Sequence, residues 1–227
     1  MNFFSHAVLA ARRSEEPEYI VGSMAPDFAS MAGMRLTEIR DTGSLAAGVD
    51  FHHRSDDAFH GAPIFVELME DARIELEERG LGFGPAAAIG HVGVELVLDG
   101  WLVDELGEVP ESYRAAMRAA ADVDQRLRFY EVDYYAGCRR WRDLCSRLLR
   151  APVPEGYRDG EFVAARLVQI LSRRPRLAVA PGDEPEVVAW AKRAYGVVGA
   201  RAPALLDQVE ERLVMLAERA ANKTASD

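Results

Sequence analysis

The chain has 227 residues, of which 49% are hydrophobic and 28% are charged, and its formal net charge is −10. This composition is typical of a soluble globular protein with a sizeable core, and the length fits a single domain. The excess of negative charge argues against nucleic acid or an anionic membrane as a general partner. We therefore predict a soluble protein that binds neither.

The two cysteines and the N-terminal segment indicate a cytoplasmic location. Cys138 and Cys145 are seven residues apart, so on one helix they would be separated by about 10 Å of rise, too far for a disulfide. Unpaired thiols are typical of a reducing compartment. In "MNFFSHAVLAARR" the positive charges follow the apolar residues, which is the reverse of a secretory signal, and no run approaches the about 20 apolar residues of a membrane span.

Helical spacing of apolar residues recurs along the whole chain, whereas the alternation typical of strands is almost absent. We predict helices over residues 6–13, 18–33, 42–60, 63–80 and 86–106, a longer helical region over 110–150, a helix over 161–174, and one or two helices over 185–221. No repeat and no long linker divides the chain. The prediction is an all-α fold, a single-domain helical bundle over residues 1–220 with a polar tail over 221–227.

Histidine is concentrated in "GVDFHHRSDDAFH", residues 48–60, which hold three of the five histidines. Residues four apart share one face of a helix, so His52, Asp56 and His60 form a single column. Imidazoles and carboxylates are the ligands that first-row divalent metals accept. The alternative is a solvated face, because this segment is polar on all sides.

His91 and Glu95 repeat the same spacing inside the apolar helix predicted over 86–106. Burying these two groups without partners would be costly. His6 and Asp27 are two further candidate ligands, although His6 could be a core histidine and Asp27 could cap a helix. The spacing predicts each column separately and leaves open whether the columns face each other.

Four short stretches resemble the acyl carrier protein phosphodiesterase family. "MNFFSHAVLA" resembles its "MNFLAHLxLA", "GSMAPDF" its "GNxxxDF", and "GVDFHHRSDDAFHGAP" its "GixxHRxiDxxTDxxP", while "LSRRPRL" matches a segment of its C-terminal part. Order and separation agree from Met1 to about residue 215. The family is similar to the HD-type phosphohydrolases, which are all-helical and use manganese or a similar ion. It hydrolyses the phosphodiester that joins 4′-phosphopantetheine to a serine of acyl carrier protein.

The positions that the resemblance covers residue by residue are His6, Asp27, His52, Asp56 and the basic Arg54. His60 stands where the family has an acidic residue, and His91 and Glu95 stand in place of two aspartates. These replacements make the predicted site richer in nitrogen, which favours iron, zinc or manganese over magnesium. Metal chemistry stays expected, and the substrate stays open.

Seven candidate ligands exceed what one ion normally takes from a protein. They are His6, Asp27, His52, Asp56, His60, His91 and Glu95. We predict a dinuclear centre of manganese, iron or zinc, with Asp27 or Asp56 as the bridging, catalytic carboxylate. Arg54 is expected to hold the substrate phosphate through paired hydrogen bonds, the alternative being a surface ion pair with Asp57 or Asp50.

Arg173, Arg174 and Arg176 in "SRRPRL" are predicted to bind the acidic carrier protein, the alternative being cations that balance a helix C-terminus. A second arginine-rich stretch, "CRRWRDLCSRLLR" (residues 138–150), is interpreted as a solvated face. The oligomeric state stays open, because the apolar spacing between 205 and 216 fits core packing as well as a dimer seam.

Three functions are compatible with these observations. The first is a metal-dependent phosphodiesterase that acts on holo-acyl carrier protein or a related phosphoester. The second is a dinuclear iron oxygenase on the same HD-type scaffold, which the nitrogen-rich ligand set motivates. The third is a non-catalytic homologue that binds an acidic protein through its arginine clusters.

Overall fold

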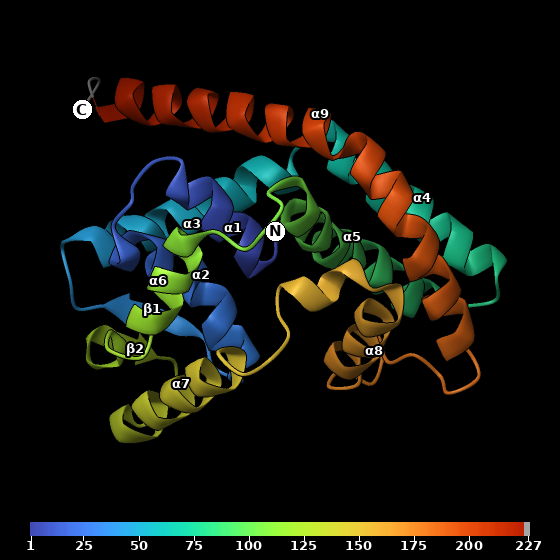
Figure 1. The fold of residues 1–227 in the computed structure, drawn as a ribbon, viewed down its shortest axis with the longest axis horizontal. Coiled ribbons are helices and arrows are strands. Elements are labelled where there is room, and N and C mark those ends of the chain that lie inside the picture. Colours follow the sequence, from blue (N-terminus) through green and yellow to red (C-terminus); the bar gives the residue numbers. More distant parts are fainter. Residues whose placement is uncertain (225–227) are drawn as a thin grey trace. The chain divides into compact units, whose positions relative to one another are not determined.

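Helices make up almost all of the secondary structure in residues 1–224, the part of the chain that the computed structural model describes (Figure 1). The predicted all-α fold is confirmed. The chain groups into two compact units, each built from two separate stretches: residues 1–56 with 108–153, and residues 57–107 with the chain from 154 onward. The single-domain organisation over 1–220 stays a prediction.

The first unit is organised around a buried N-terminal helix. Its elements are α1 (Phe3–Ala11), α2 (Pro17–Met31), β1 (Leu36–Ile39), most of α3 (Ser44–His60), α6 (Glu111–Ala119), η1 (Asp124–Arg126), β2 (Leu127–Phe129) and α7 (Tyr134–Leu148). Every residue from Phe3 to Ala10 is buried. This is the expected position of a helix that is apolar on nearly all sides.

A small sheet interrupts the region that the sequence predicted as continuously helical. β1 and β2 pair antiparallel, with Leu36 opposite Phe129 and Ile39 opposite Leu127. α6 therefore ends before the sheet, and α7 begins afresh after Asp133, whose carboxylate accepts hydrogen bonds from two backbone amides of the first turn. The pairing joins segments far apart in the chain, so local spacing could not reveal it.

Helices α2 and α3 approach each other closely at two glycines. A Cβ on Gly48 would lie 2.1 Å from the carbonyl oxygen of Tyr19, and a Cβ on Gly22 would lie 2.2 Å from the carbonyl oxygen of Leu45. Both distances are far below van der Waals contact with backbone atoms that cannot move aside, so only glycine permits this approach. The approach sets how near Asp27 on α2 comes to His52 on α3.

We expect Gly48→Ala to destabilise the protein by about 1–3 kcal/mol, because the added methyl group overpacks a contact between two backbones. Gly196→Ala is the matched control, since no atom lies within 4 Å of a Cβ at that helical position. The control should be neutral or slightly stabilising. Urea unfolding of both variants measures the difference, and equal stabilities would contradict a steric role for Gly48.

The second unit is built around the long apolar helix α5. Its elements are the last turn of α3, α4 (Pro63–Glu78), α5 (Phe83–Glu105), η2 (Glu155–Arg158), α8 (Gly160–Leu171) and α9 (Glu184–Thr224). α5 packs against α4, α8, α9 and η2. By length and composition alone α5 could cross a membrane, contrary to the expectation that no run of the chain reaches that length. Most of its apolar window is buried in the structure, and the core helix of a soluble protein has the same character.

The C-terminal helix α9 forms one continuous element with Pro203 in its interior. Leu205, Leu206, Val209 and Leu213 are buried, so packing within the chain accounts for their apolar spacing. Residues 221–224, predicted as the start of a polar tail, are still helical, and residues 225–227 lie outside the described residues.

Candidate metal sites

Six of the seven predicted ligands gather into two triads, one in each unit. Triad 1 consists of His6, Asp27 and His52, and triad 2 consists of His60, His91 and Glu95. In each triad, one ligand atom from every residue lies within 4.8 Å of the others. Each triad therefore offers two imidazoles and one carboxylate, a set that can hold a divalent transition-metal ion.

Triad 1 draws one residue from each of three helices of the first unit. His6 comes from the buried α1, Asp27 from α2 and His52 from α3. The imidazole rings of His6 and His52 lie with their centroids 4.0 Å apart, and both residues are buried, whereas Asp27 is half-buried. The triad thus sits within the interior of the unit, with its carboxylate on the more open side.

Hydrogen bonds fix which nitrogen of each triad 1 imidazole is available. The hydroxyl group of Ser55 donates its one proton to the carbonyl oxygen of His52, at 3.0 Å. Toward Nδ1 of His6, at 2.9 Å, it can therefore only accept, so Nδ1 is the donor. Nδ1 of His52 donates to the carbonyl oxygen of Ser23 at 2.8 Å. Both rings therefore carry their proton on Nδ1 and keep the lone pair of Nε2 for a metal, as the outer partners of metal-binding histidines commonly arrange.

These two serines were not among the residues predicted from the sequence. Ser55 follows His52 by three residues on α3, and that spacing on one helix face was the available signal. Ser23 acts through its backbone carbonyl group, which no side-chain pattern reveals.

Burial keeps His52 in the uncharged form that binds metal. Its loss of hydration, with a smaller effect of the neighbouring His6, lowers the pKa of His52 from 6.5 to about 3. A neutral imidazole is the ligand form, so triad 1 needs little or no proton release from His52 at neutral pH.

The depressed pKa predicts that acid destabilises the metal-free protein through His52. Between pH 6.5 and about 3 the unfolded chain binds a proton at this residue and the folded chain does not. The free energy of unfolding should therefore fall, by up to about 1.4 kcal/mol per pH unit from this one group. Urea unfolding of chelator-treated wild type and His52→Gln across this range measures it. Identical pH slopes in the two proteins would contradict the assignment.

Asp56, the seventh predicted ligand, lies beside triad 1. Its Oδ1 atom is 3.7 Å from Nε2 of His6 and 2.8 Å from the amino group of Met1. Asp56 follows His52 by one helical turn, as the column predicted, and its side chain is partly exposed. Asp56 is therefore a partly exposed carboxylate beside triad 1 that forms an ion pair with the amino group of Met1.

Triad 2 forms a nearly equilateral triangle of ligand atoms. Nε2 of His60 lies 3.2 Å from Nε2 of His91 and 3.1 Å from Oε1 of Glu95, and the two α5 atoms are 3.3 Å apart. The rings of His60 and His91 stack with an interplanar angle of 15°. The last turn of α3 and the middle of α5 thus present three ligand atoms to a common point.

This triangle fits a bound ion. An ion about 2.1 Å from each of three ligand atoms holds them about 3.0 Å apart in an octahedral face and about 3.4 Å apart in a tetrahedral face. The measured separations of 3.1–3.3 Å fall between these two values. Protons on both Nε2 atoms would set two donors against each other, whereas an ion accepts all three lone pairs.

Burial and hydrogen bonding act in opposite directions on Glu95. Burial disfavours the charged carboxylate, yet attraction to positive charge, with a smaller effect of the imidazoles of His60 and His91, outweighs it and lowers the pKa of Glu95 below its usual value. The carboxylate is 12% exposed and the His91 side chain 41% exposed. Triad 2 thus combines an ionised ligand with an open side on which water or a substrate could bind.

The predicted arginines lie on the surface. Nε of Arg54 donates to the carbonyl oxygen of Asp50 one turn earlier on α3, at 3.4 Å, and the side chain is exposed. Arg173, Arg174 and Arg176 are exposed in the segment after α8. Their roles toward phosphate and carrier protein stay predictions.

A cavity of about 710 Å³ is lined in part by residues that are sequence neighbours of triad 1 ligands: Pro26 precedes Asp27, and His53 follows His52. It is lined from α2, the turn before β1, β1 itself and α3, with both apolar and polar side chains, among them Met34, Val49, Asp50 and His53. Its volume is that of a small-molecule site. His53 follows His52 directly, and their rings lie 5.4 Å apart, so the cavity wall comes close to a candidate ligand.

Comparisons with known proteins add no assignment: no family model, curated protein or solved structure matches the chain. Membership of the acyl carrier protein phosphodiesterase family therefore stays a prediction from the motifs. The fold and the two triads define the chain as an all-α protein with two candidate metal sites.

Proposed function

We propose that this protein is a metal-dependent phosphoester hydrolase with a divalent ion at each triad. The observation that supports it most is the triangle of His60, His91 and Glu95, whose ligand atoms stand 3.1–3.3 Å apart. Manganese, iron and zinc all accept such a ligand set. The carboxylate-bridged dinuclear arrangement inferred from the sequence stays a prediction.

When bound, the ions supply an acidified water molecule and neutralise phosphoryl oxygens. The residues of the chain hold and orient this chemistry. Ser55 and the carbonyl group of Ser23 fix the tautomers of the triad 1 histidines. Asp56, partly exposed beside His6, is the residue best suited to accept a proton from an attacking water.

The proposed substrate is the phosphodiester of holo-acyl carrier protein or a related phosphoester, as the sequence resemblance implies. We propose that the cavity between α2, β1 and α3 receives the organic part of this substrate, because it lies next to Asp27 and His52 along the chain. Its mixed lining suits an apolar chain that carries hydrogen-bonding groups.

Incubation with holo-acyl carrier protein and manganese tests the proposal, with the mass of the carrier as the readout. We expect loss of the 4′-phosphopantetheine arm, and no loss after chelation of the metal. Bis(4-nitrophenyl) phosphate is the second substrate, because it reports phosphodiester hydrolysis without a carrier protein. Hydrolysis of neither substrate by metal-loaded protein would reject the hydrolase.

Filling the cavity should weaken substrate binding. We expect Ala46→Trp, which projects a large ring into the cavity from α3, to raise KM about tenfold with little change in kcat. Ala47→Trp is the matched control, because Ala47 is the exposed neighbour and is not part of the lining. Steady-state kinetics on the hydrolysed substrate measures both. Equal KM values would place the substrate elsewhere.

An iron-dependent oxygenase is the second candidate function. Both triads contain two histidines and one carboxylate, which is the ligand set of non-haem iron(II) oxygenases with open positions. Protein purified under anaerobic conditions with iron(II) tests it. Substrate-dependent oxygen consumption would favour the oxygenase, whereas hydrolysis with manganese in the absence of oxygen would favour the phosphodiesterase.

A further inference from the structure

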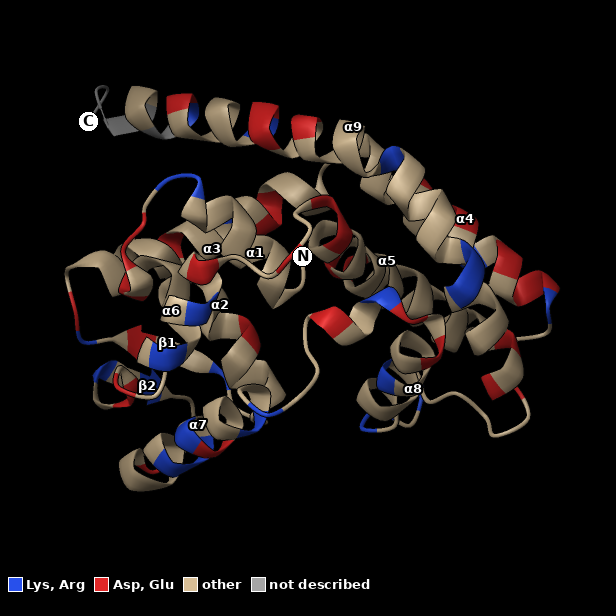
Figure 2. Cartoon of the chain, in the orientation of Figure 1, with Lys and Arg blue, Asp and Glu red and all other residues tan. Residues whose placement is uncertain are grey.

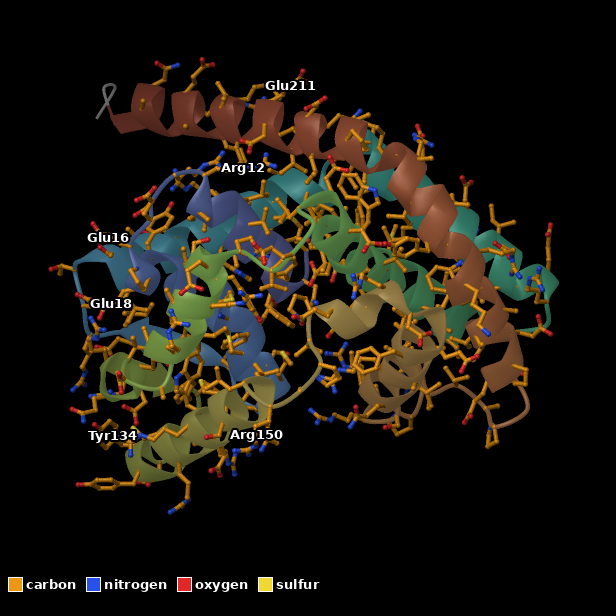
Figure 3. All side chains as sticks on the ribbon, in the orientation of Figure 1. Arg12, Glu16, Glu18, Tyr134, Arg150 and Glu211 are labelled. Carbon is orange, nitrogen blue, oxygen red and sulfur yellow. The ribbon has the colours of Figure 1, made fainter. Side chains whose placement is uncertain are left out.

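Helix α7 carries a row of arginines on its solvent face. Tyr135, Arg139, Arg142 and Ser146 recur at helical spacing along one side, and Arg150 continues this spacing two residues beyond the end of the helix. The opposite side, which includes Trp141, Leu144 and Cys145, is buried in the first unit. In Figure 2 the charged positions of the helix are mostly basic, and Figure 3 labels Tyr134 and Arg150 near its two ends.

This basic face contrasts with the rest of the chain. Residues 134–150 contain five arginines and one aspartate, whereas the whole chain has 27 basic and 37 acidic residues. Some arginines elsewhere are neutralised: Arg73 and Arg126, for example, each pair with two carboxylates. On a protein of net charge −10, α7 therefore carries a local excess of positive charge, which is longer than the one in residues 172–176.

Four of the five arginines have no ion-pair partner among the described residues; they are Arg139, Arg140, Arg147 and Arg150. Arg142 differs, because its Nε atom lies 2.7 Å from Oδ2 of the buried Asp124 and thereby neutralises an interior carboxylate. The remaining guanidinium groups are exposed and can bind carboxylates of another molecule in paired hydrogen bonds.

Apolar surface flanks the arginines at both ends of the face. Tyr135 is 75% exposed near the start of α7, and Leu149 is 53% exposed just after its end. Tyrosine and arginine together are enriched in protein interfaces, where the ring provides buried area and the guanidinium provides directed hydrogen bonds. A surface needed only for solubility would not require either exposed apolar group.

We propose that this face of α7 binds an acidic, amphipathic helix of a protein partner. α7 has 15 residues, so it is about 22 Å long, and a helix of similar length with carboxylates one turn apart would match the arginine row. The apolar ends of that helix would contact Tyr135 and Leu149. The surface belongs to the first unit and shares no residue with either triad, so it can be tested without metal.

A nucleic acid fits this face less well. Single-stranded nucleic acid is bound by successive stacking rings along a positive groove. Here the guanidinium of Arg128 lies 4.6 Å from the ring centroid of Tyr134, the partly exposed first residue of α7, so one face of that ring is occupied. Tyr135 is the more exposed of the two tyrosines of the helix, and two adjacent residues do not form a row of stacking rings along it. The net charge of the chain also repels a long polyanion.

Fluorescence anisotropy with a labelled synthetic helical peptide tests the proposal. The peptide carries glutamates along one face and a leucine at each end, and a second peptide has the same composition with the glutamates distributed around the helix. We expect the first to bind more tightly, and the double variant Arg139→Gln, Arg150→Gln to weaken that binding about tenfold or more. Tyr135→Ser should weaken it to a smaller extent, and added salt should weaken it in the wild type.

Matched controls distinguish binding at the α7 face from nonspecific attraction of the peptide to positive charge anywhere on the protein. Arg40→Gln with Arg114→Gln removes the same charge from other elements of the first unit and should leave peptide affinity within about twofold. Circular dichroism confirms that each variant is folded. The proposal is overturned if both peptides bind alike, if this control loses affinity equally, or if an oligothymidylate binds as tightly and is lost in the same α7 variants.

Discussion

His52→Ala is expected to empty triad 1 and to lower the proposed phosphodiesterase activity by about 100-fold or more. The substitution removes an imidazole whose ring stands 4.0 Å from that of His6, with its Nδ1 proton held by the carbonyl oxygen of Ser23. His6 and Asp27 alone leave too few ligands for tight binding of an ion. Metal analysis of the purified protein and the initial rate of hydrolysis measure the two effects.

His53→Ala is the matched control for metal content. His53 is the adjacent histidine of α3, but it is exposed and belongs to neither triad. This variant should retain all of its metal, although its activity can change because His53 lines the cavity. If His52→Ala binds as much metal as the wild type, the assignment of triad 1 is wrong.

The second large effect is expected from Glu95→Gln, which removes one charge without changing the size of the side chain. The carboxylate of Glu95 is the anionic corner of the triangle with His60 and His91. A neutral amide is a much weaker ligand, so we expect the metal of triad 2 to be lost and hydrolysis to fall about 100-fold or more. The metal content should fall from two ions to one per chain.

Glu105→Gln is the corresponding control, because Glu105 lies on the same helix and is exposed at its end. It makes the same chemical change outside the triad and should leave both metal content and rate unaltered. A Glu95→Gln protein that keeps its full metal content would show that triad 2 is a hydrogen-bonded cluster of side chains instead of a metal site.

Local spacing predicted much of the helical structure and most of the candidate ligands. The helices predicted over 18–33, 42–60 and 63–80 closely match α2, α3 and α4. The columns on α3 and α5 were visible because residues four apart on a helix always share a face. His6 and Asp27 stand in no periodic column, so residue type alone made them candidates and the family resemblance then supported them.

Contacts between segments far apart in the chain could not be predicted in this way. The pairing of β1 with β2 splits the region over 110–150 because it satisfies backbone groups of two distant segments. The hydrogen bond of Ser55 depends on the packing of α1, which places Nδ1 of His6 2.9 Å from the Ser55 hydroxyl group. The arginines of 138–150 were interpreted as an ordinary solvated face, and the sequence could not show that four of the five have no ion-pair partner among the described residues while Arg142 pairs with Asp124.

The sequence by itself determined an all-α fold and the residue types that could bind metal, since both follow from periodicity and side-chain chemistry along single helices. Only the tertiary structure decided how the ligands group. His52 and His60 share one column of α3, yet His52 joins His6 and Asp27 while His60 joins His91 and Glu95. The reason is physical: a helix fixes which of its own side chains share a face, but the helices packed against that face decide which groups each side chain meets.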